Sequence, residues 1–248
     1  MQELRRRSIA EIIQSSGAVK ISELAKHFET SEMTIHRDLD FLQKQGVLQK
    51  KRGGAVANSF SEMFSNRSIL NLEKKREVAQ KAYGLIEEHD VIALDGSTTS
   101  IEVAKLIKNG KYVTVFTNSL YVLYELENAE NVELYVLGNY YNHQMVHFTG
   151  CDIHEQISNL TFSKCFIGAA GISENLDLYE PFPMLASIKI KMIQQSVAAY
   201  AVVDSSKFGK YSVQKFCNVS DLAALITNDD VGEPYRSKLL ETSSTPLS

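Results

Sequence analysis

The chain has 248 residues and a formal net charge of -4, with 44% hydrophobic and 23% charged residues. These values are typical of compact globular proteins and exclude disordered and fibrous chains. No run approaches the ~18 consecutive apolar residues of a membrane helix, and the arginine-rich start lacks the apolar segment of a signal peptide, so a cytoplasmic location is expected.

Apolar residues recur at helical spacing in three short segments at the start of the chain. The first, residues 4–16, stops at Gly17; the second follows Ser22 as its N-cap; the third follows Ser31 and ends at Gly46. The buried stripe of the third helix consists of Ile35, Leu39 and Leu42. Three such small helices have to share one core.

A hairpin and a linker are predicted next. Residues 47–50 and 55–57 flank a Lys-Arg-Gly-Gly tip at 51–54, where paired glycines allow a tight reversal. Serine and asparagine residues interrupt the apolar pattern from 58 to 71. We therefore place a first domain at residues 1–57, a linker at 58–73 and a second domain at 74–248.

The second domain alternates between helical and strand patterns. Helices are predicted at 72–87, 100–107, 120–127 and 186–196, and strands at 91–94, 112–116, 132–137, 164–167, 199–203 and 222–226. Strands separated by helices at this spacing predict a mainly parallel α/β sheet that is covered on both faces.

The third helix has a cationic and polar face opposite its apolar stripe. Met33, Arg37 and Lys44 point away from the stripe, with Thr34 and His36 at its sides. Such a helix fits the major groove of DNA, and the hairpin tip can grip phosphates. Residues 1–57 also carry ten Lys or Arg against seven Asp or Glu. Helix spacing alone is also compatible with an alternative, a dimerisation module whose charges are merely solvated.

Five motifs narrow the choice: Arg-Arg-Arg at 5–7, Ile-Ser-Glu-Leu-Ala at 21–25, Ser-Glu-Met-Thr-Ile-His-Arg-Asp-Leu at 31–39, Gln-Gly-Val-Leu at 45–48 and Arg-Gly-Gly-Ala at 52–55. Together they closely resemble the winged helix-turn-helix of DeoR-family bacterial transcriptional regulators. The resemblance implies a recognition helix at 31–45 and a wing centred on 50–54. The residues expected to contact DNA are Arg5, Arg6, Arg7, Ser31, Met33, Thr34, His36, Arg37, Lys44, Lys50, Lys51 and Arg52.

One position departs from the family pattern. His36 stands where the family usually has a second arginine. Because the charge of histidine changes near neutral pH, contacts to DNA at this position are expected to be weaker or pH-dependent.

Polar residues follow four of the predicted strands where each ends. In an open parallel sheet ligands bind outside the carboxyl ends of the strands, so these loops are expected to form one crevice. Hydroxyls at a helix start and Lys207 favour a phosphate, and Asp95 and Asp204 can accept from sugar hydroxyls. Each residue alone would serve equally as a cap or turn residue. The expected effector site is Asp95, Gly96, Ser97, Thr98, Thr99, Asn118, Ser119, Gly168, Gly171, Asp204 and Lys207.

These loops, together with Lys189 and Met192, also resemble the DeoR-family sensor domain, which is similar in fold to ribose-5-phosphate isomerase and coenzyme A transferases. The resemblance spans about residues 74–229 and implies a phosphorylated sugar or related metabolite as effector. Three positions depart from the family pattern. Gly96-Ser97 reverses the usual order of the two small residues in the first loop, Gly138-Asn139 stands in place of a double glycine, and Leu185 stands where a glutamate is usual. An unusual ligand is therefore expected.

Two alternatives to a sugar-phosphate sensor are a zinc site and an isomerase. His143, His147, Cys151 and His154 are zinc-ligand types at short spacing, but Gly150 would break any helix there, so we expect no metal and no cofactor. An isomerase fused to a DNA-binding head would use Asp95 or Asp204 as base and Lys207 as charge stabiliser. The three cysteines are odd in number, lack a C-x-x-C pair and are expected to be free.

The residues favour a regulator, expected to be a non-enzymatic repressor that binds double-stranded operator DNA and a sugar phosphate, over an enzyme or an assembly protein without a DNA role. A homo-oligomer is expected because paired heads that read repeated half-sites gain specificity and avidity.

Overall fold

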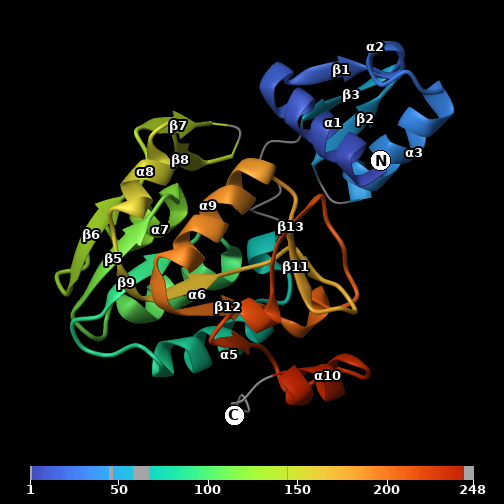
Figure 1. The fold of residues 1–248 in the computed structure, drawn as a ribbon. Helices are drawn as coiled ribbons and strands as arrows, with labels where there is room; N and C mark the ends of the chain where they lie inside the picture. Colours follow the sequence, from blue (N-terminus) through green and yellow to red (C-terminus); the bar gives the residue numbers. More distant parts are fainter. Residues whose placement is uncertain (1, 45–46, 58–66, 144, 243–248) are drawn as a thin grey trace.

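The computed structural model describes residues 2–44, 47–57, 67–143 and 145–242. It contains a small N-terminal part, here called the head (residues 2–57), and a larger part, the body (residues 67–242), each with its own cluster of buried apolar residues. Figure 1 shows the head, in blue, set beside one end of the body. The predicted helix end at Gly46 and most of the predicted linker, residues 58–66, lie outside the described residues.

The head is built from three helices and a small antiparallel sheet. The helices are α1 (Gln2–Ser16), α2 (Ile21–His27) and α3 (Glu32–Lys44), and the strands, in the order β1-β3-β2, are β1 (Ala18–Lys20), β3 (Gly54–Ala57) and β2 (Leu48–Lys51). Its core is closed by Ile9, Ile13, Ile35, Leu39 and Leu42, all fully buried. The predicted helices and hairpin are confirmed.

Two details of the head differ from the prediction. Residues 18–20 form a third strand that pairs with β3, and α2 follows it directly. The N-cap of α2 is therefore Lys20, and Ser22 lies inside the helix instead of capping it. The strand was missed because three residues are too few to show an alternating pattern.

A six-stranded sheet forms the centre of the body. Its order is β14-β12-β9-β4-β5-β6, and every neighbouring pair is parallel. The strands are β14 (Ala224–Ile226), β12 (Ser196–Val202), β9 (Phe162–Ile167), β4 (Val91–Leu94), β5 (Val113–Thr117) and β6 (Val132–Val136). The predicted parallel sheet is confirmed, with each strand within three residues of its predicted ends.

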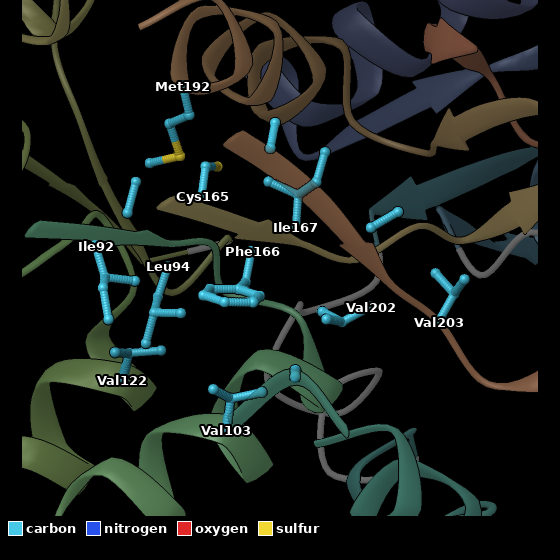
Figure 2. Packing of buried hydrophobic residues seen from close by; sticks show 14 of the residues in the cluster. Ile92, Leu94, Val103, Val122, Cys165, Phe166, Ile167, Met192, Val202 and Val203 are labelled. Atoms are coloured by element: carbon cyan, nitrogen blue, oxygen red, sulfur yellow. The ribbon is translucent and has the colours of Figure 1, made fainter. Parts of the chain in front are cut away.

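Helices cover both faces of this sheet. One face carries α5 (Leu72–Gly84), α6 (Thr98–Ile107) and α7 (Leu120–Leu126), and the other carries α8 (Ile153–Ser158) and α9 (Pro183–Gln194). In Figure 2, Val103 and Val122 approach the sheet from one side, and Met192 of α9 packs near Cys165 on the other. Successive β9 residues 165–167 are all fully buried, as expected for a strand covered on both sides.

Shorter elements complete the body. Three strands form an antiparallel sheet, β10 (Gly171–Ile172), β11 (Asp177–Glu180) and β13 (Gln214–Asn218), and two form a hairpin, β7 (Tyr140–Asn142) and β8 (His147–Thr149). The 3-10 helices η1 (Ser205–Lys207) and η2 (Val219–Asp221) and the helix α10 (Tyr235–Thr242) follow. Within the described ranges, no helix has both the length and the apolar character needed to span a membrane.

The head and body touch through the segment that precedes β13. Val213 is only 3% exposed and belongs to the buried cluster of the head. All other members of that cluster lie between α1 and β3, which ends at Ala57. Arg6 and Phe41 of the head and Tyr179 and Tyr211 of the body border one shared depression. The segment from residue 207 to 213 therefore runs from the edge of the parallel sheet to the head.

Candidate functional site

The outward face of α3 is exposed and carries the predicted polar residues. Met33 is 63% exposed, and Arg37 and Lys44 are also exposed, while Thr34 and His36 are half-buried at the sides. The opposite face, with Ile35 and Leu39, is fully buried. An exposed helix with this arrangement can enter the major groove of DNA.

The beginning of α3 and the wing are fixed by side-chain contacts. The Ser31 hydroxyl accepts from the Thr34 backbone N–H at 3.2 Å, which confirms the predicted cap. Lys50 donates to Asp40 of α3 at 2.6 Å, and this hydrogen bond lowers the pKa of the Asp40 carboxyl. Lys51 and Arg52 are exposed at the wing tip. The wing is thus held beside the recognition helix.

The three N-terminal arginines lie elsewhere. The Nε atoms of Arg5 and Arg6 donate to the two oxygens of the fully buried Asp38, at 2.6 and 2.9 Å. The Arg6 guanidinium also lies 4.0 Å from the Phe41 ring centroid. Arg7 borders a depression shared with the body. Arg5 and Arg6 therefore join α1 to α3, and DNA contact by any of the three stays a prediction.

The main pocket of the body lies at the carboxyl ends of β4, β5, β9 and β12 and is here called the sheet-edge pocket. Its cavity volume is about 50 Å³. It is lined by Arg67, Asp95, Gly96, Ser97, Thr98, Thr99, Asn118, His147, Gly168, Ala169, Ala170, Glu180, Leu185, Ile188, Lys189, Met192, Val202, Val203 and Lys207.

Most of the predicted effector residues line this pocket, and three do not. Ser119 is the buried N-cap of α7, Gly171 pairs with Tyr179 in the antiparallel sheet, and Asp204 accepts from the Ser206 N–H as the cap of η1. Prediction from sequence missed Arg67, His147 and Glu180 as pocket residues. Of these, the sequence singles out only His147, and as a zinc-ligand type.

The start of α6 supplies backbone donors to the pocket. The Ser97 hydroxyl accepts from the Ser100 N–H at 3.1 Å and caps the helix, and the first N–H groups of a helix have no partner within it. Gly168 packs so closely that a Cβ on it would lie 2.3 Å from the Ser97 Cβ. The helix end is thus positioned for an anion.

A buried ionic cluster forms the floor of the pocket. The Lys189 ammonium lies 2.5 Å from Glu180, 3.1 Å from Asp95 and 2.9 Å from the Gly168 carbonyl. Burial raises the pKa of Asp95, but Lys189 and hydrogen bonds from Ser100, Gly168 and Ser97 outweigh it, so the pKa is lowered. Burial lowers the pKa of Lys189, yet Glu180 and Asp95 raise it above the usual value.

His147 occupies the space above Gly96. A Cβ on Gly96 would lie 2.0 Å from the His147 Nε2, so no side chain fits at position 96 beside this histidine. The reversed Gly96-Ser97 order is therefore compatible with His147, which fills the space that a side chain at position 96 would need. The His147 Nδ1 lies 2.6 Å from the Met145 carbonyl, and burial lowers the pKa of the ring, which favours a neutral imidazole.

Two further cations border the pocket. Burial lowers the pKa of Lys207 to about 8; Asp204 opposes this shift, while Arg67, Lys210 and Lys75 add to it. Burial also lowers the pKa of Arg67. Cations that are crowded and partly removed from water are stabilised by an anionic ligand.

The described residues contain no group of three or more His, Cys, Asp or Glu that could hold a metal ion. His147 lies in the pocket, whereas the exposed His154 lies 3.3 Å from the Ser187 hydroxyl. The spacing of these histidines therefore does not bring them together as metal ligands. Cys151, Cys165 and Cys217 are free thiols.

Comparisons with known proteins give a consistent result. A family model described as a DeoR-like helix-turn-helix domain matches residues 5–60, and one described as a DeoR C terminal sensor domain matches residues 70–229. The L-fucose operon activator of Haemophilus influenzae is 34% identical over 89% of each chain. The lactose phosphotransferase system repressor of Staphylococcus epidermidis is 32% identical over 90% of each chain, and the putative aga operon transcriptional repressor of Escherichia coli is 29% identical over 92% of this chain and 86% of its own.

Among solved structures, ribose 5-phosphate isomerase A from Methanocaldococcus jannaschii is similar over 56% of this chain and 55% of its own, with 17% identity and a TM-score of 0.42.

Proposed function

The chain belongs to the DeoR family of DNA-binding transcriptional regulators, and on that premise we propose that it represses a sugar operon and is controlled by a phosphorylated sugar in the sheet-edge pocket. The family consists of regulators and not of enzymes, so the isomerase and assembly alternatives are set aside. Several relatives are named as repressors and one as an activator of operons.

The observation that carries this proposal is the set of groups that meet in the pocket. Lys207, Arg67 and the first N–H groups of α6 offer positive charge and donors to a phosphate, while Asp95 and Glu180, both in contact with Lys189, offer carboxylate oxygens to sugar hydroxyls. A neutral sugar offers no charge to these two cations, whose pKa values are lowered by burial. A phosphate ester satisfies both sets of groups.

The test begins with a duplex selected by the full-length protein from a random DNA pool. A panel of sugar phosphates and the matching free sugars is then screened for a rise in melting temperature, because a ligand of the native state stabilises it. A phosphorylated hit should change the affinity for the selected duplex and relieve repression in transcription in vitro. Stabilisation by free sugars alone would contradict the proposal.

We further propose a homo-oligomer with paired heads, in which residues 1–57 and 74–248 act as separate domains joined by the linker 58–73. One recognition helix offers limited contact with DNA, and paired heads on repeated half-sites gain affinity. In the structure α5 already begins at Leu72 and Lys75 holds the carbonyls of Arg67 and Leu70, so linker residues 67–73 belong to the body. The cytoplasmic location follows from the proposed operator DNA.

Replacing Arg37 with alanine is expected to weaken binding to the selected duplex by about 10- to 100-fold per half-site, the range of a lost bidentate base contact. Arg37 is exposed on the outward face of α3, so its removal should leave the melting temperature unchanged. Fluorescence anisotropy with the selected and a scrambled duplex measures both specific and non-specific affinity.

Two variants control this result. Arg37→Lys keeps the charge but not the planar fork, so it should retain non-specific binding and lose specificity. Arg76→Ala removes an exposed arginine of the body and should have no effect. Equal affinity of Arg37→Ala and the unaltered protein would mean that α3 does not read the DNA bases.

The affinity for a phosphorylated effector should fall about tenfold between pH 7 and 9. Lys207 has a pKa of about 8, so about nine-tenths of it is protonated at pH 7 and about one-tenth at pH 9. Only the protonated form attracts the anion. Isothermal titration calorimetry across this window measures the slope and the proton uptake on binding.

Lys207→Met should bind the effector more weakly at pH 7 and show no slope of affinity between pH 7 and 9, with unliganded DNA binding intact. Lys210→Met, which removes an exposed lysine of the same loop, should keep a slope of the same sign, displaced to higher pH because Lys210 helps to lower the pKa of Lys207. A slope that persists in Lys207→Met would assign the titration to another group.

A further inference from the structure

Arg67 lies in the short segment that connects the head to the body, yet its side chain lines the sheet-edge pocket. Residues 67–69 are helical and are followed by a turn before α5 begins at Leu72. The other charged residues of the pocket wall come from the body's sheets, from α9 and from the loop after β12. Among the lining residues that the structure describes, Arg67 is the one that belongs to the predicted linker.

Hydrogen bonds hold this segment against the body. The Lys75 ammonium, only 3% exposed, donates to the carbonyl oxygens of Arg67 and Leu70. Asn71, the N-cap of α5, has a left-handed backbone with φ 56°, which turns the chain sharply from the segment into the helix. The path of the segment past the pocket is therefore defined by the body.

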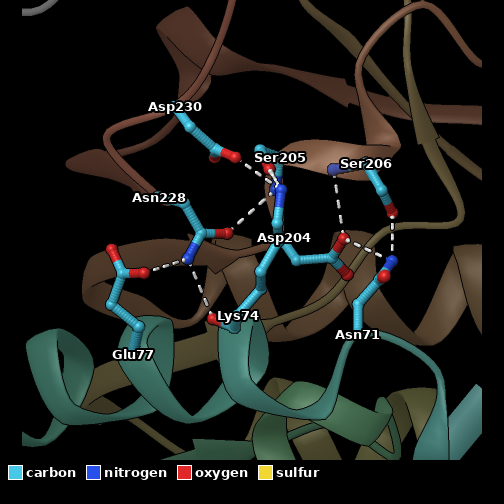
Figure 3. Close-up of polar contacts among 8 residues, drawn as sticks. All are labelled: Asn71, Lys74, Glu77, Asp204, Ser205, Ser206, Asn228 and Asp230. Atoms are coloured by element: carbon cyan, nitrogen blue, oxygen red, sulfur yellow. Dashed lines mark hydrogen bonds and ion pairs between the residues drawn. The ribbon is translucent and has the colours of Figure 1, made fainter.

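The same segment is joined to the loop that carries Lys207. The Asn71 side-chain amide donates to the Ser206 hydroxyl at 2.9 Å and to Asp204 at 3.4 Å, and the Lys74 ammonium donates to the Ser205 hydroxyl at 2.8 Å. Figure 3 shows these contacts between α5 and the residues 204–206. Arg67 and Lys207 are thus carried by two pieces of chain that are tied together.

The charges in this region favour an anion. Arg67 and Lys75 each lower the pKa of Lys207, which shows that the three cations lie close enough to repel one another. Carboxylates offset part of this charge: Asp204 acts on Lys75 and Lys207, Glu102 acts on Lys75, and Glu180 and Asp95 act on Arg67. A phosphate between Arg67 and Lys207 would relieve this repulsion, and a guanidinium matches two phosphate oxygens at once.

The size of the cavity makes the position of Arg67 sensitive to ligand. The cavity of about 50 Å³ is well below the roughly 300–1,000 Å³ of ordinary ligand pockets. A sugar phosphate can enter only if lining side chains move. Arg67 and Lys207 are long side chains that border the pocket. Arg67 is itself part of the segment that connects the head to the body, so a change in its position is a change in that segment.

We propose that Arg67 is an anion-binding residue of the sheet-edge pocket, so that the segment leading to the DNA-binding head grips the effector's phosphate together with the body. This inference rests on the proposed function of the pocket. Binding of the phosphate at Arg67 then couples the ligand to the linker, and by linkage the DNA and the effector change each other's affinity equally.

The experiment uses the full-length protein and inorganic phosphate as the probe, with chloride at equal ionic strength as the reference. Affinity is obtained from calorimetric titration and from the phosphate-dependent melting temperature. Arg67→Met is expected to bind phosphate at least tenfold more weakly than the unaltered protein, because the charged hydrogen-bond donor is lost. Arg67→Lys should bind it a few-fold more weakly, because the charge stays but the planar guanidinium does not. Arg76→Met, an exposed arginine on α5, should bind normally.

The outcomes separate this inference from the proposed function. Normal phosphate affinity in Arg67→Met, with loss in Lys207→Met, would overturn the role of Arg67 and leave the pocket as an anion site. No phosphate binding by the unaltered protein would overturn both. If Arg67→Met does not fold, Arg67→Lys decides: weakened phosphate binding at an unchanged melting temperature supports the inference, and unchanged binding overturns it.

Discussion

Replacing Lys189 with methionine is expected to lower the free energy of unfolding by about 3 to 5 kcal/mol, the range for removing one partner of a buried ion pair. Lys189 is 6% exposed and lies within 3.1 Å of both Asp95 and Glu180. Without it, the two buried carboxylates lose the ammonium that contacts both of them. Calorimetry should show the body melting roughly 6 to 20 °C lower at neutral pH.

The deficit should shrink as the pH falls. In the unaltered protein Lys189 holds the pKa of Asp95 below its usual value, so this contribution is present above the unfolded pKa and is lost in acid. In Lys189→Met, burial would instead raise the pKa of the Asp95 carboxyl, and its protonation in acid would reduce the penalty. A deficit that is equal at pH 5 and 7 would indicate that packing, and not charge, is responsible.

Two matched variants isolate the electrostatic part. Lys191→Met removes a lysine two residues along α9 that is not part of this cluster and should change stability by less than about 1 kcal/mol. Glu180→Gln combined with Lys189→Met should recover part of the loss, because only one buried carboxylate then remains without a counter-ion. Additive losses in this double variant would contradict the proposed coupling.

The parallel sheet was predictable because its strands are short apolar runs that end at polar residues. Asp95 follows β4, Asn118 follows β5 and Gly168 follows β9, so the end of each strand coincided with the point where the pocket begins. The chain direction of parallel strands brings these ends to one edge. The pocket's location therefore followed from strand order, without any knowledge of side-chain contacts.

The antiparallel strands were not predictable in the same way. β10 has two residues, and β11 pairs with β13 across a bulge between Leu178 and Tyr179. Strands this short show no alternation, and their partners are distant in the chain. Glu180 reaches the pocket at the end of β11, so its part in the ionic cluster had no signal in sequence spacing.

Arg67 and His147 were missed for a related reason. Arg67 follows a run rich in serine and asparagine that indicates a linker, and its position in the pocket depends on Lys75 and Asn71 holding the chain. His147 reaches the space beside Gly96 because β8 pairs with β7 and bridges to Ser119. The sequence showed that Gly96 and Ser97 stand in reversed order, but it gave no signal that His147 lies beside them.

Replacing Asp38 with alanine is expected to destabilise the head by about 3 kcal/mol, the sum of two charge-assisted hydrogen bonds at the lower end of their range. Asp38 is fully buried and accepts hydrogen bonds from the Nε atoms of Arg5 and Arg6, and these bonds join α1 to α3. The arginines are about one-fifth exposed and regain water, which keeps the loss moderate. Specific DNA binding should be lost at temperatures where the body is still folded.

The prediction distinguishes a structural arginine pair from a DNA-contacting one. Asp40→Ala, two residues along α3, breaks only an exposed pair with Lys50 and should cost less than about 1 kcal/mol. If Arg5 and Arg6 act through Asp38, then Asp38→Ala lowers the melting transition of the head and Arg5→Ala does the same, with DNA affinity falling in step. If Arg5→Ala weakens DNA binding at an unchanged melting temperature, the arginine contacts DNA directly.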